Sequence, residues 1–192
     1  MASASENPRR LPAHAVRVFK GVIFEVYQWE QELFDGSFKT FEKLRRNDSS
    51  VVIPVLPGGK LLMTEDEQPG RDLVLTFPGG ESENGESPEH AARRELLEET
   101  GYEAETMTLV RSSDPSSKIA WTIHTFIARG CRKTAPQALD AGERITTRAV
   151  TLDELIGFAD DPRFQNRELQ IPLIKARYDK DVRASLEKLL FG

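Results

Sequence analysis

The sequence of 192 residues lacks three features that would each place it in a special class. A single cysteine, Cys131, rules out a disulfide within the chain. No apolar run reaches the ~20 residues of a membrane-spanning helix, and residues 1–10 hold no hydrophobic segment like that of a secretory signal. Positive charge is not in excess, because the formal net charge is −5. We therefore expect a cytoplasmic protein with neither a membrane association nor a stable nucleic acid partner.

The composition is that of an ordinary globular protein. Hydrophobic residues make up 39% and charged residues 30% of the chain, so we expect it to fold rather than stay disordered. A chain of this length can bury a core without disulfides. We expect a flexible tail over residues 1–13, an N-terminal β-ribbon over residues 14–46, and one main domain with C-terminal helices over residues 47–192.

The first half of the sequence indicates strands. Val16 to Tyr27 is rich in β-branched and aromatic residues, and a second run continues from Trp29 to Leu33. Asp35-Gly36 marks a tight turn, after which Phe38 to Leu44 returns as a partner strand. The ribbon is therefore predicted to be antiparallel.

The remainder alternates between short apolar runs and helical patterns, which predicts a mixed sheet with helices on its faces, an α/β fold. The predicted strands cover residues 51–56, 61–63, 73–77, 107–111, 121–128 and 145–150. The predicted C-terminal helices cover residues 152–159, 168–176 and 181–190.

One further helix has clear boundaries. Ser87 is a good N-cap and Pro88 suits the first helical position. Glu89 lies in the first turn, where a negative charge complements the helix dipole. Gly101 is placed to end the helix in a left-handed conformation.

This helix carries three carboxylates on one face. Glu99 lies one turn after Glu95, and Glu98 lies beside them. Like charges at this spacing destabilise a helix by a few tenths of a kcal/mol, roughly, which a bound cation would offset. Carboxylate oxygens suit Mg²⁺ or Mn²⁺, and Pro78-Gly79-Gly80 allows a backbone carbonyl to approach the same ion. Taken alone, however, such a pattern is most often a solvated acidic face.

The surrounding residues favour the metal site, because they share the register of a known motif. The matching positions are Gly80, Glu86, Arg94, Glu95, Leu96, Glu98, Glu99 and Gly101. This spacing resembles the Nudix box, with Tyr102 standing where that family prefers an aliphatic residue. The resemblance implies a Nudix-type α/β/α sandwich with a mixed sheet, to which the N-terminal antiparallel β-ribbon is added.

The resemblance also implies a reaction. Nudix enzymes hydrolyse a nucleoside diphosphate linked to another moiety, with Mg²⁺ or Mn²⁺. Carried onto this chain, the metal ligands are the carbonyl of Gly79 and the side chains of Glu95, Glu98 and Glu99. Glu98 and Glu99 are thereby catalytic residues.

Three further residues receive roles from the same resemblance. Glu86 and Arg94 form a structural pair in which Arg94 orients the carboxylates. The general base varies within the family. Here Glu143 fits the second acid of a Glu-x-Glu pattern in which Ala141 replaces the first, so it is either a ligand or base, or a loop carboxylate in water.

The ribbon points to a branch of the family. A β-ribbon before a Nudix domain resembles the ADP-ribose and nucleotide-sugar pyrophosphatases, which usually dimerise through it, so a homodimer is expected. Aromatic residues of the ribbon, Trp29 foremost with Tyr27 and Phe41, are candidates to stack on a base. Their alternative role is packing within the ribbon.

Phosphate-binding residues are fewer than in that branch. Where an arginine-rich segment is common, this chain has Glu65 and Glu67, which leaves Arg71 to meet a phosphate. Lys118 either meets a phosphate or is solvated. Two other functions therefore stay open: hydrolysis of nucleoside triphosphates or dinucleotide cofactors, and binding of a nucleotide metabolite without catalysis.

Overall fold

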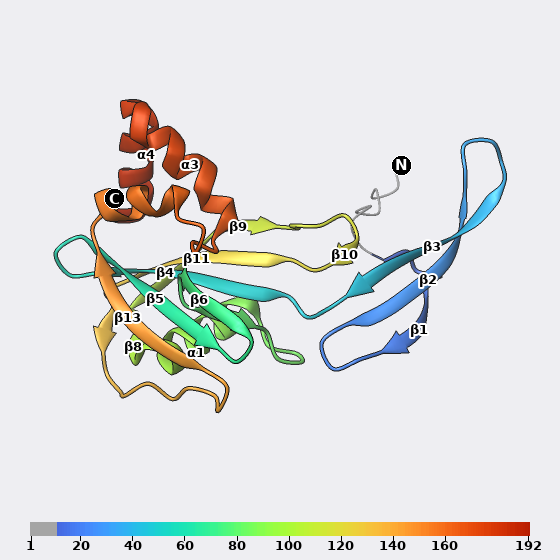
Figure 1. Cartoon of the computed structure of the whole chain (residues 1–192), viewed down its shortest axis with the longest axis horizontal. Helices are drawn as coiled ribbons and strands as arrows, with labels where there is room; N and C mark the ends of the chain where they lie inside the picture. The colour runs from blue at the N-terminus through green and yellow to red at the C-terminus, as the bar shows by residue number, and fades with distance from the viewer. Residues whose placement is uncertain (1–10) are drawn as a thin grey trace.

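A computed structural model describes residues 11–192 of the protein. Figure 1 shows two unequal parts, a main body that holds all the helices and a ribbon of strands that projects away from it. Most of the predicted tail over residues 1–13 lies outside the described residues. Within residues 11–192, every helix is too short or too polar to cross a lipid bilayer.

The ribbon is an antiparallel meander of β1 (Val16–Lys20), β2 (Glu25–Glu32) and β3 (Phe38–Arg45). The predicted turn between the last two strands is present, with Gly36 at φ 81°. The long strand expected from Val16 to Tyr27 is instead two strands, because the chain turns back between residues 20 and 25. A two-residue strand of the main body, β10 (Ile119–Ala120), pairs in parallel with β3 and ties the ribbon to the body.

The main sheet has the strand order β13-β5-β4-β11-β9, with β6 paired to β5 and β7 paired to β4. It is mixed, because β4 and β11 run parallel while the other pairs are antiparallel. The strands are β4 (Ser49–Leu56), β5 (Lys60–Gln68), β6 (Arg71–Thr76), β7 (Gly79–Glu81), β9 (Thr106–Ser113), β11 (Ile123–Arg129) and β13 (Arg144–Val150). A separate short pair joins β8 (Tyr102–Glu103) to β12 (Arg132–Lys133).

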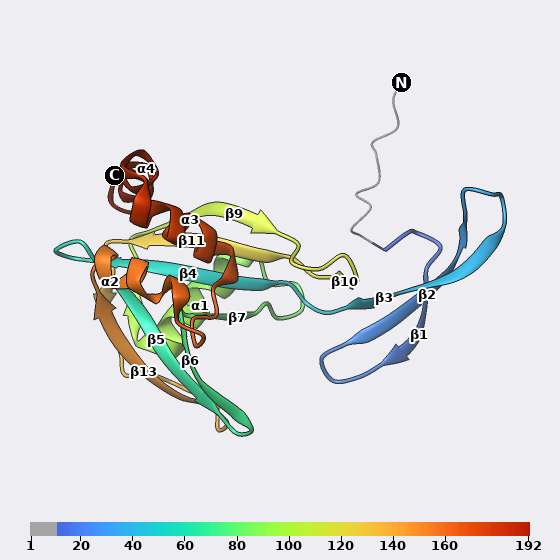
Figure 2. The ribbon, with the colours of Figure 1, turned by 45° about the horizontal axis from the view of Figure 1, so that its top comes forward.

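Helices cover both faces of this sheet, as Figure 2 shows. One face carries α1 (Pro88–Thr100), and the other carries α2 (Leu152–Gly157), the short helix η1 (Phe158–Asp160), α3 (Arg167–Tyr178) and α4 (Lys180–Phe191). Successive residues of β4 pack against helices on opposite faces of the sheet. Val52 belongs to the hydrophobic cluster that contains Leu96 of α1, and Ile53 belongs to the cluster that contains Leu173 of α3. The predicted α/β/α arrangement is thus present.

The fold differs from the sequence prediction at the Pro78-Gly79-Gly80 segment. This segment does not simply end a strand. Instead it opens β7, in which Gly79 and Gly80 pair with Val51 and Ser50 of β4. A three-residue strand is too short to show a period-two pattern. Its pairing brings the glycines next to α1.

Candidate functional site

The ends of α1 fix which face the carboxylates occupy. The Ser87 hydroxyl accepts a hydrogen bond from the backbone of His90 at 3.2 Å, and Gly101 closes the helix at φ 76° with its N–H on the carbonyl of Leu97. The start of the helix is held to the sheet because the hydroxyl of Ser50 donates to the carbonyl of Pro88. Both predicted caps are therefore present.

The three carboxylates of α1 are graded from buried to exposed. Glu99 is 9% exposed and accepts a hydrogen bond from the backbone N–H of Gly79 at 3.0 Å. The side chain of Glu95 is 13% exposed and that of Glu98 is 43% exposed. Glu99 is thus held by the sheet, while Glu98 is in contact with solvent.

Both glycines of β7 are required by close approach. A Cβ on Gly79 would lie 2.2 Å from the carbonyl oxygen of Ser50. A Cβ on Gly80 would lie 2.3 Å from Oε1 of Glu95. The first contact brings two backbones together. The second lets a helix carboxylate lie directly on a strand.

Arg94 links the loop before α1 to the carboxylates. Its Nε and Nη2 each donate to Glu86 at 3.1 Å, and Nη2 also donates to the carbonyl of Glu81 at 3.0 Å. Its Nη1 donates to Glu95 at 2.8 Å and to Glu98 at 3.0 Å. These bonds hold the pKa of Glu86 below its ordinary value and raise that of Arg94. The expected pair of Glu86 and Arg94 is formed.

Acidic side chains from α1, β5 and the loop before β13 are close enough for their charges to raise the pKa of neighbouring carboxylates. Burial raises the pKa of Glu99 to about 9, and the charges of Glu95, Glu143 and Asp66 add to that rise. Burial also raises the pKa of Glu95, against the opposing charge of Arg94. The pKa of Glu143 is raised by burial and then by Asp140, Asp66 and Glu98. Glu143, in the loop before β13, is therefore close enough for its charge to act on Glu95 and Glu99, while its role as a ligand or base stays a prediction.

This set of oxygen donors suits a hard divalent cation, which would relieve the repulsion between the carboxylates. Over residues 11–192, no three acidic, histidine or cysteine side chains already form a closed metal-binding shell. Arg94 instead bridges Glu95 and Glu98. The half-exposed Glu98 has the freedom to turn toward an ion. The donors fit Mg²⁺ or Mn²⁺ by chemistry, and binding requires side chains to rearrange.

The predicted substrate-binding residues fall in different places. Arg71 lies beside Asp66 of β5, with Nη2 3.5 Å from Oδ2 of that residue. Trp29 lies in the ribbon, its ring 6.0 Å from that of Phe41. The carbonyl of Lys118 accepts from the backbone of Leu44 in β3. Within a single chain, Trp29 and Lys118 are therefore part of the ribbon region and stand apart from α1.

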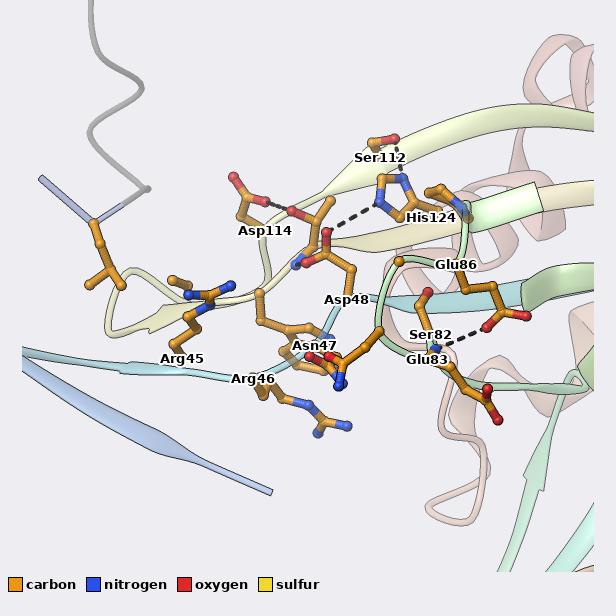
Figure 3. A pocket seen from close by; sticks show the side chains of 17 residues that line it. Arg45, Arg46, Asn47, Asp48, Ser82, Glu83, Glu86, Ser112, Asp114 and His124 are labelled. Carbon is orange, nitrogen blue, oxygen red and sulfur yellow. Dashed lines mark hydrogen bonds and ion pairs between the residues drawn. The ribbon is translucent and has the colours of Figure 1, made fainter. Parts of the chain in front are cut away.

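A polar cleft of about 820 Å³ lies where the ribbon joins the main body (Figure 3). On one side it is lined by residues 45–48, and on another by the loop that contains Glu86. The guanidinium of Arg46 lies 4.8 Å from the ring centre of Trp121 and 2.9 Å from a carboxylate oxygen of Glu81. His124 contacts Ser112 at 2.9 Å. Glu86 is shared with the Arg94 contacts, whereas the α1 carboxylates do not line the cleft.

Sequence reasoning missed this cleft and also missed Asp66. The cleft is built from loops, which show no hydrophobic period. The available signal was the run of polar residues Arg45-Arg46-Asn47-Asp48 between two strands. Asp66 was missed because the predicted strand ends at residue 63, whereas β5 continues to Gln68.

Comparison with known proteins agrees with this geometry. The chain is 31% identical over 158 residues to a methanol dehydrogenase activator of Bacillus methanolicus. This match covers 81% of this chain and 85% of the relative. The chain is 30% identical over 143 residues to an ADP-ribose pyrophosphatase of Bacillus subtilis strain 168, covering 73% and 77%. An ADP-sugar pyrophosphatase of Mus musculus is 44% identical over 71 residues, covering 34% and 33%.

A solved structure and a family model extend the comparison. The crystal structure of an ADP compounds hydrolase is similar in fold, with a TM-score of 0.71 at 20% identity, covering 90% of this chain and 94% of that one. The model of the NUDIX domain matches residues 45–172, which include the carboxylates of α1 and the Arg94 contacts. The chain therefore belongs to the Nudix family and is a Nudix hydrolase.

Proposed function

We propose that this enzyme hydrolyses the diphosphate bond of a nucleoside diphosphate linked to another moiety, with ADP-ribose and nucleotide sugars as its substrate class. The observation that carries the proposal is the group of three carboxylates on α1, which bond to Arg94 and to the backbone N–H of Gly79 in β7. The names of two relatives, an ADP-ribose pyrophosphatase and an ADP-sugar pyrophosphatase, support the substrate class. The proposed location is the cytoplasm.

Mg²⁺ is the proposed cofactor, with Mn²⁺ as a substitute. Glu95, Glu98 and Glu99 would hold it together with the carbonyl of Gly79. When bound, the ion supplies charge stabilisation at the phosphoryl oxygens and activates the attacking water. Without the ion, a diphosphate would be repelled by this surface.

Residues of the protein position the metal-binding carboxylates and accept the proton of the attacking water. Arg94 donates to the carboxylates of Glu95 and Glu98 at 2.8 and 3.0 Å and so bridges them. Glu143 comes from the loop before β13, a different element from α1, and its charge acts on Glu95 and Glu99. Its carboxylate is placed by the backbone N–H of Asp140 at 3.3 Å. We assign Glu143 as the proton acceptor for the attacking water.

Salt bridges to a neighbouring strand partly neutralise the negative charge that would repel a phosphate near Arg71. Glu67 pairs with Arg144 at 3.0 Å, and Glu65 lies 3.8 Å from Arg148. Both arginines come from β13, next to β5 in the sheet. Arg71, at the start of β6 and 3.5 Å from Asp66, is the residue that would meet a substrate phosphate.

The ribbon supports a homodimer. Apolar side chains along it lie open to solvent, with Val22 and Phe34 fully exposed and Phe19 and Phe38 59% and 62% exposed. A projecting ribbon with this surface is unusual for a monomer and typical of a protein interface. In a dimer, Trp29 and Lys118 of one copy could serve the site of the other. Their substrate-binding roles depend on that assembly.

A substrate panel tests the reaction. It contains ADP-ribose, nucleotide sugars, dinucleotide cofactors and nucleoside triphosphates, each with and without Mg²⁺, and products are separated by chromatography. We expect Mg²⁺-dependent cleavage of ADP-ribose or a nucleotide sugar. Preferential cleavage of triphosphates or dinucleotides would overturn the substrate class. Metal-independent binding without turnover on any member would show a binding protein instead.

Two substitutions test the metal ligands. Glu98→Gln and Glu99→Gln keep the helix and the side-chain volume, and each should lower kcat at least ~100-fold, the scale for losing one electrostatic stabiliser of the transition state. Glu89→Gln is the matched control, because Glu89 lies on the same helix and pairs with Arg93 on its outer face. Near-full activity of both Glu98→Gln and Glu99→Gln would show that the ligand assignment is wrong.

A further inference from the structure

Asp66, in the middle of β5, carries a buried oxygen that has no partner. The residue is 8% exposed, and within residues 11–192 its Oδ1 has no hydrogen-bond partner. Its Oδ2 has two long contacts, with Nε2 of Gln68 at 3.4 Å and Nη2 of Arg71 at 3.5 Å. Burying a carboxylate oxygen without a donor or a cation is costly. This oxygen is therefore suited to a ligand.

The alternation of β5 places Asp66 on the α1 face of the sheet. Leu61 and Met63 pack in the cluster beneath the C-terminal helices. The neighbouring Glu65 has the same parity as those two and lies 3.8 Å from Arg148, which stacks on Phe158 of η1. Asp66 points the opposite way, because successive side chains of a strand alternate between faces.

Asp66 thereby faces the acidic group described above. The helix α1 contacts β13, the strand that pairs with β5. Asp66 pairs in register with Ile145, two residues after Glu143. Three elements, α1, β5 and the loop before β13, therefore present carboxylates to the same space.

We propose that Asp66 is an additional carboxylate of the divalent-cation site, to which it supplies Oδ1. The inference rests on the metal-dependent reaction proposed above and extends its ligand set to a strand outside residues 80–102. It also accounts for the unpaired oxygen, because a cation is the partner that the protein itself does not provide. The long contact with Arg71 leaves that oxygen free.

A competing role for Asp66 is to position Arg71 alone. The two roles differ in what they predict for metal binding without substrate. If Asp66 only positions Arg71, then Arg71→Gln and Asp66→Asn should behave alike. If Asp66 belongs to the cation site, Asp66→Asn should weaken cation binding and Arg71→Gln should not.

The experiment is a titration of the full-length protein with Mn²⁺, followed by electron paramagnetic resonance of the free ion, with no substrate present. Asp66→Asn should weaken Mn²⁺ affinity about 10-fold or more, the scale reported for groups that support a metal site. Glu65→Gln is the matched control, since it removes the same charge one residue away on the opposite face. It should leave the affinity within about 2-fold of wild type, because exposed charges are screened.

The outcomes separate the two proposals. If Glu98→Gln weakens Mn²⁺ binding but Asp66→Asn does not, the role of Asp66 is overturned and the metal site stands. If wild-type protein binds no Mn²⁺, both fail. A thermal melt of metal-free Asp66→Asn checks its folding, and we expect a melting temperature no lower than wild type, because the variant replaces a buried carboxylate whose Oδ1 has no partner among the described residues.

Discussion

Arg94 and Glu86 form a two-bond contact in which Nε and Nη2 of the guanidinium each lie 3.1 Å from a different carboxylate oxygen. The Glu86 side chain is 7% exposed, so little water competes for these bonds. A fork of this kind is stronger and more directional than a single ionic contact. Because the same guanidinium also contacts Glu95 and Glu98, it fixes the distance between the loop and the helix carboxylates.

Removing Arg94 should therefore cost stability as well as activity. Arg94→Ala leaves Glu86 buried without its partner, and we expect the free energy of unfolding to fall by about 3–5 kcal/mol. Arg94→Lys should restore only part of the lost free energy, because a single ammonium group cannot contact both carboxylate oxygens of Glu86 and also reach Glu95. Urea denaturation measures both changes. Combining Arg94→Ala with Glu86→Gln closes a double-mutant cycle, and a coupling energy near zero would contradict the pairing.

Gly80→Ala should impair catalysis without unfolding the protein. The new methyl group would meet Oε1 of Glu95, the far end of a flexible side chain, and would push that carboxylate aside. A displacement of about 1 Å at such a site can lower the rate about 100-fold. The measurements are kcat and the Mn²⁺ affinity, with Gly157→Ala as control because its Cβ meets nothing within 4 Å. Unchanged values for both would show that the position of Glu95 is unimportant.

Gly79→Ala offers the contrasting case. Its methyl group would meet the carbonyl of Ser50, which belongs to the backbone of β4 and cannot turn away. We expect this variant to lose stability, seen as a lower melting temperature, before any effect on catalysis can be measured. A melting temperature equal to that of wild type would contradict the close approach of β7 to β4.

Replacing apolar residues of the ribbon should dissociate the proposed dimer. Phe19 and Ile23 are 59% and 54% exposed in a single chain, so Phe19→Asp with Ile23→Asp should place charges in the interface. Light scattering after gel filtration should give twice 21.6 kDa for wild type and 21.6 kDa for the variant. The control is Lys39→Asp in the exposed part of β3. A monomeric wild type would refute the dimer.

Glu168 of α3 should make stability depend on pH. Burial raises its pKa above the ordinary value of 4.5, with partial opposition from Arg111 and Asn166. The folded state therefore binds this proton more tightly than the unfolded state. The stabilisation is complete below 4.5 and is lost as the pH rises through the raised pKa. Glu168→Gln removes this dependence.

Urea denaturation at about pH 4 and about pH 7 checks this expectation. The two proteins should be close in stability at the lower pH, and the variant should be the more stable at the higher pH. Glu103→Gln, at an exposed position, is the control and should change little at either pH. If wild type and Glu168→Gln keep the same difference at both pH values, the burial of Glu168 has no effect on its ionisation.

Local rules were sufficient to predict the elements that carry the chemistry. The caps Ser87 and Gly101 bounded α1 because helix ends need specific side chains and a left-handed residue. The turn at Gly36 was likewise encoded by its own residues. The pairing of β7 with β4 was not predictable, because it depends on a contact between segments about 30 residues apart and on a strand too short to show a pattern.

The candidate site was predictable to the extent that one helix supplies it. Glu95, Glu98 and Glu99 follow from their spacing on α1, whereas Asp66 and the cleft require knowledge of which strands are neighbours. A strand residue reveals its face only when its partners are known. Trp29 and Lys118 lie in the ribbon region, and their substrate-binding roles stay predictions.

The two-residue strand β10 has a mechanical consequence. It joins the ribbon to the main body through β3, and the residues that follow it, Trp121 and Thr122, form a wall of the cleft. Arg46, directly after β3, lies over the ring of Trp121. In Figure 1, β10 lies between the main body and the ribbon. Arg46 and Trp121, which both line the cleft, are therefore kept next to each other by the pairing of β3 with β10.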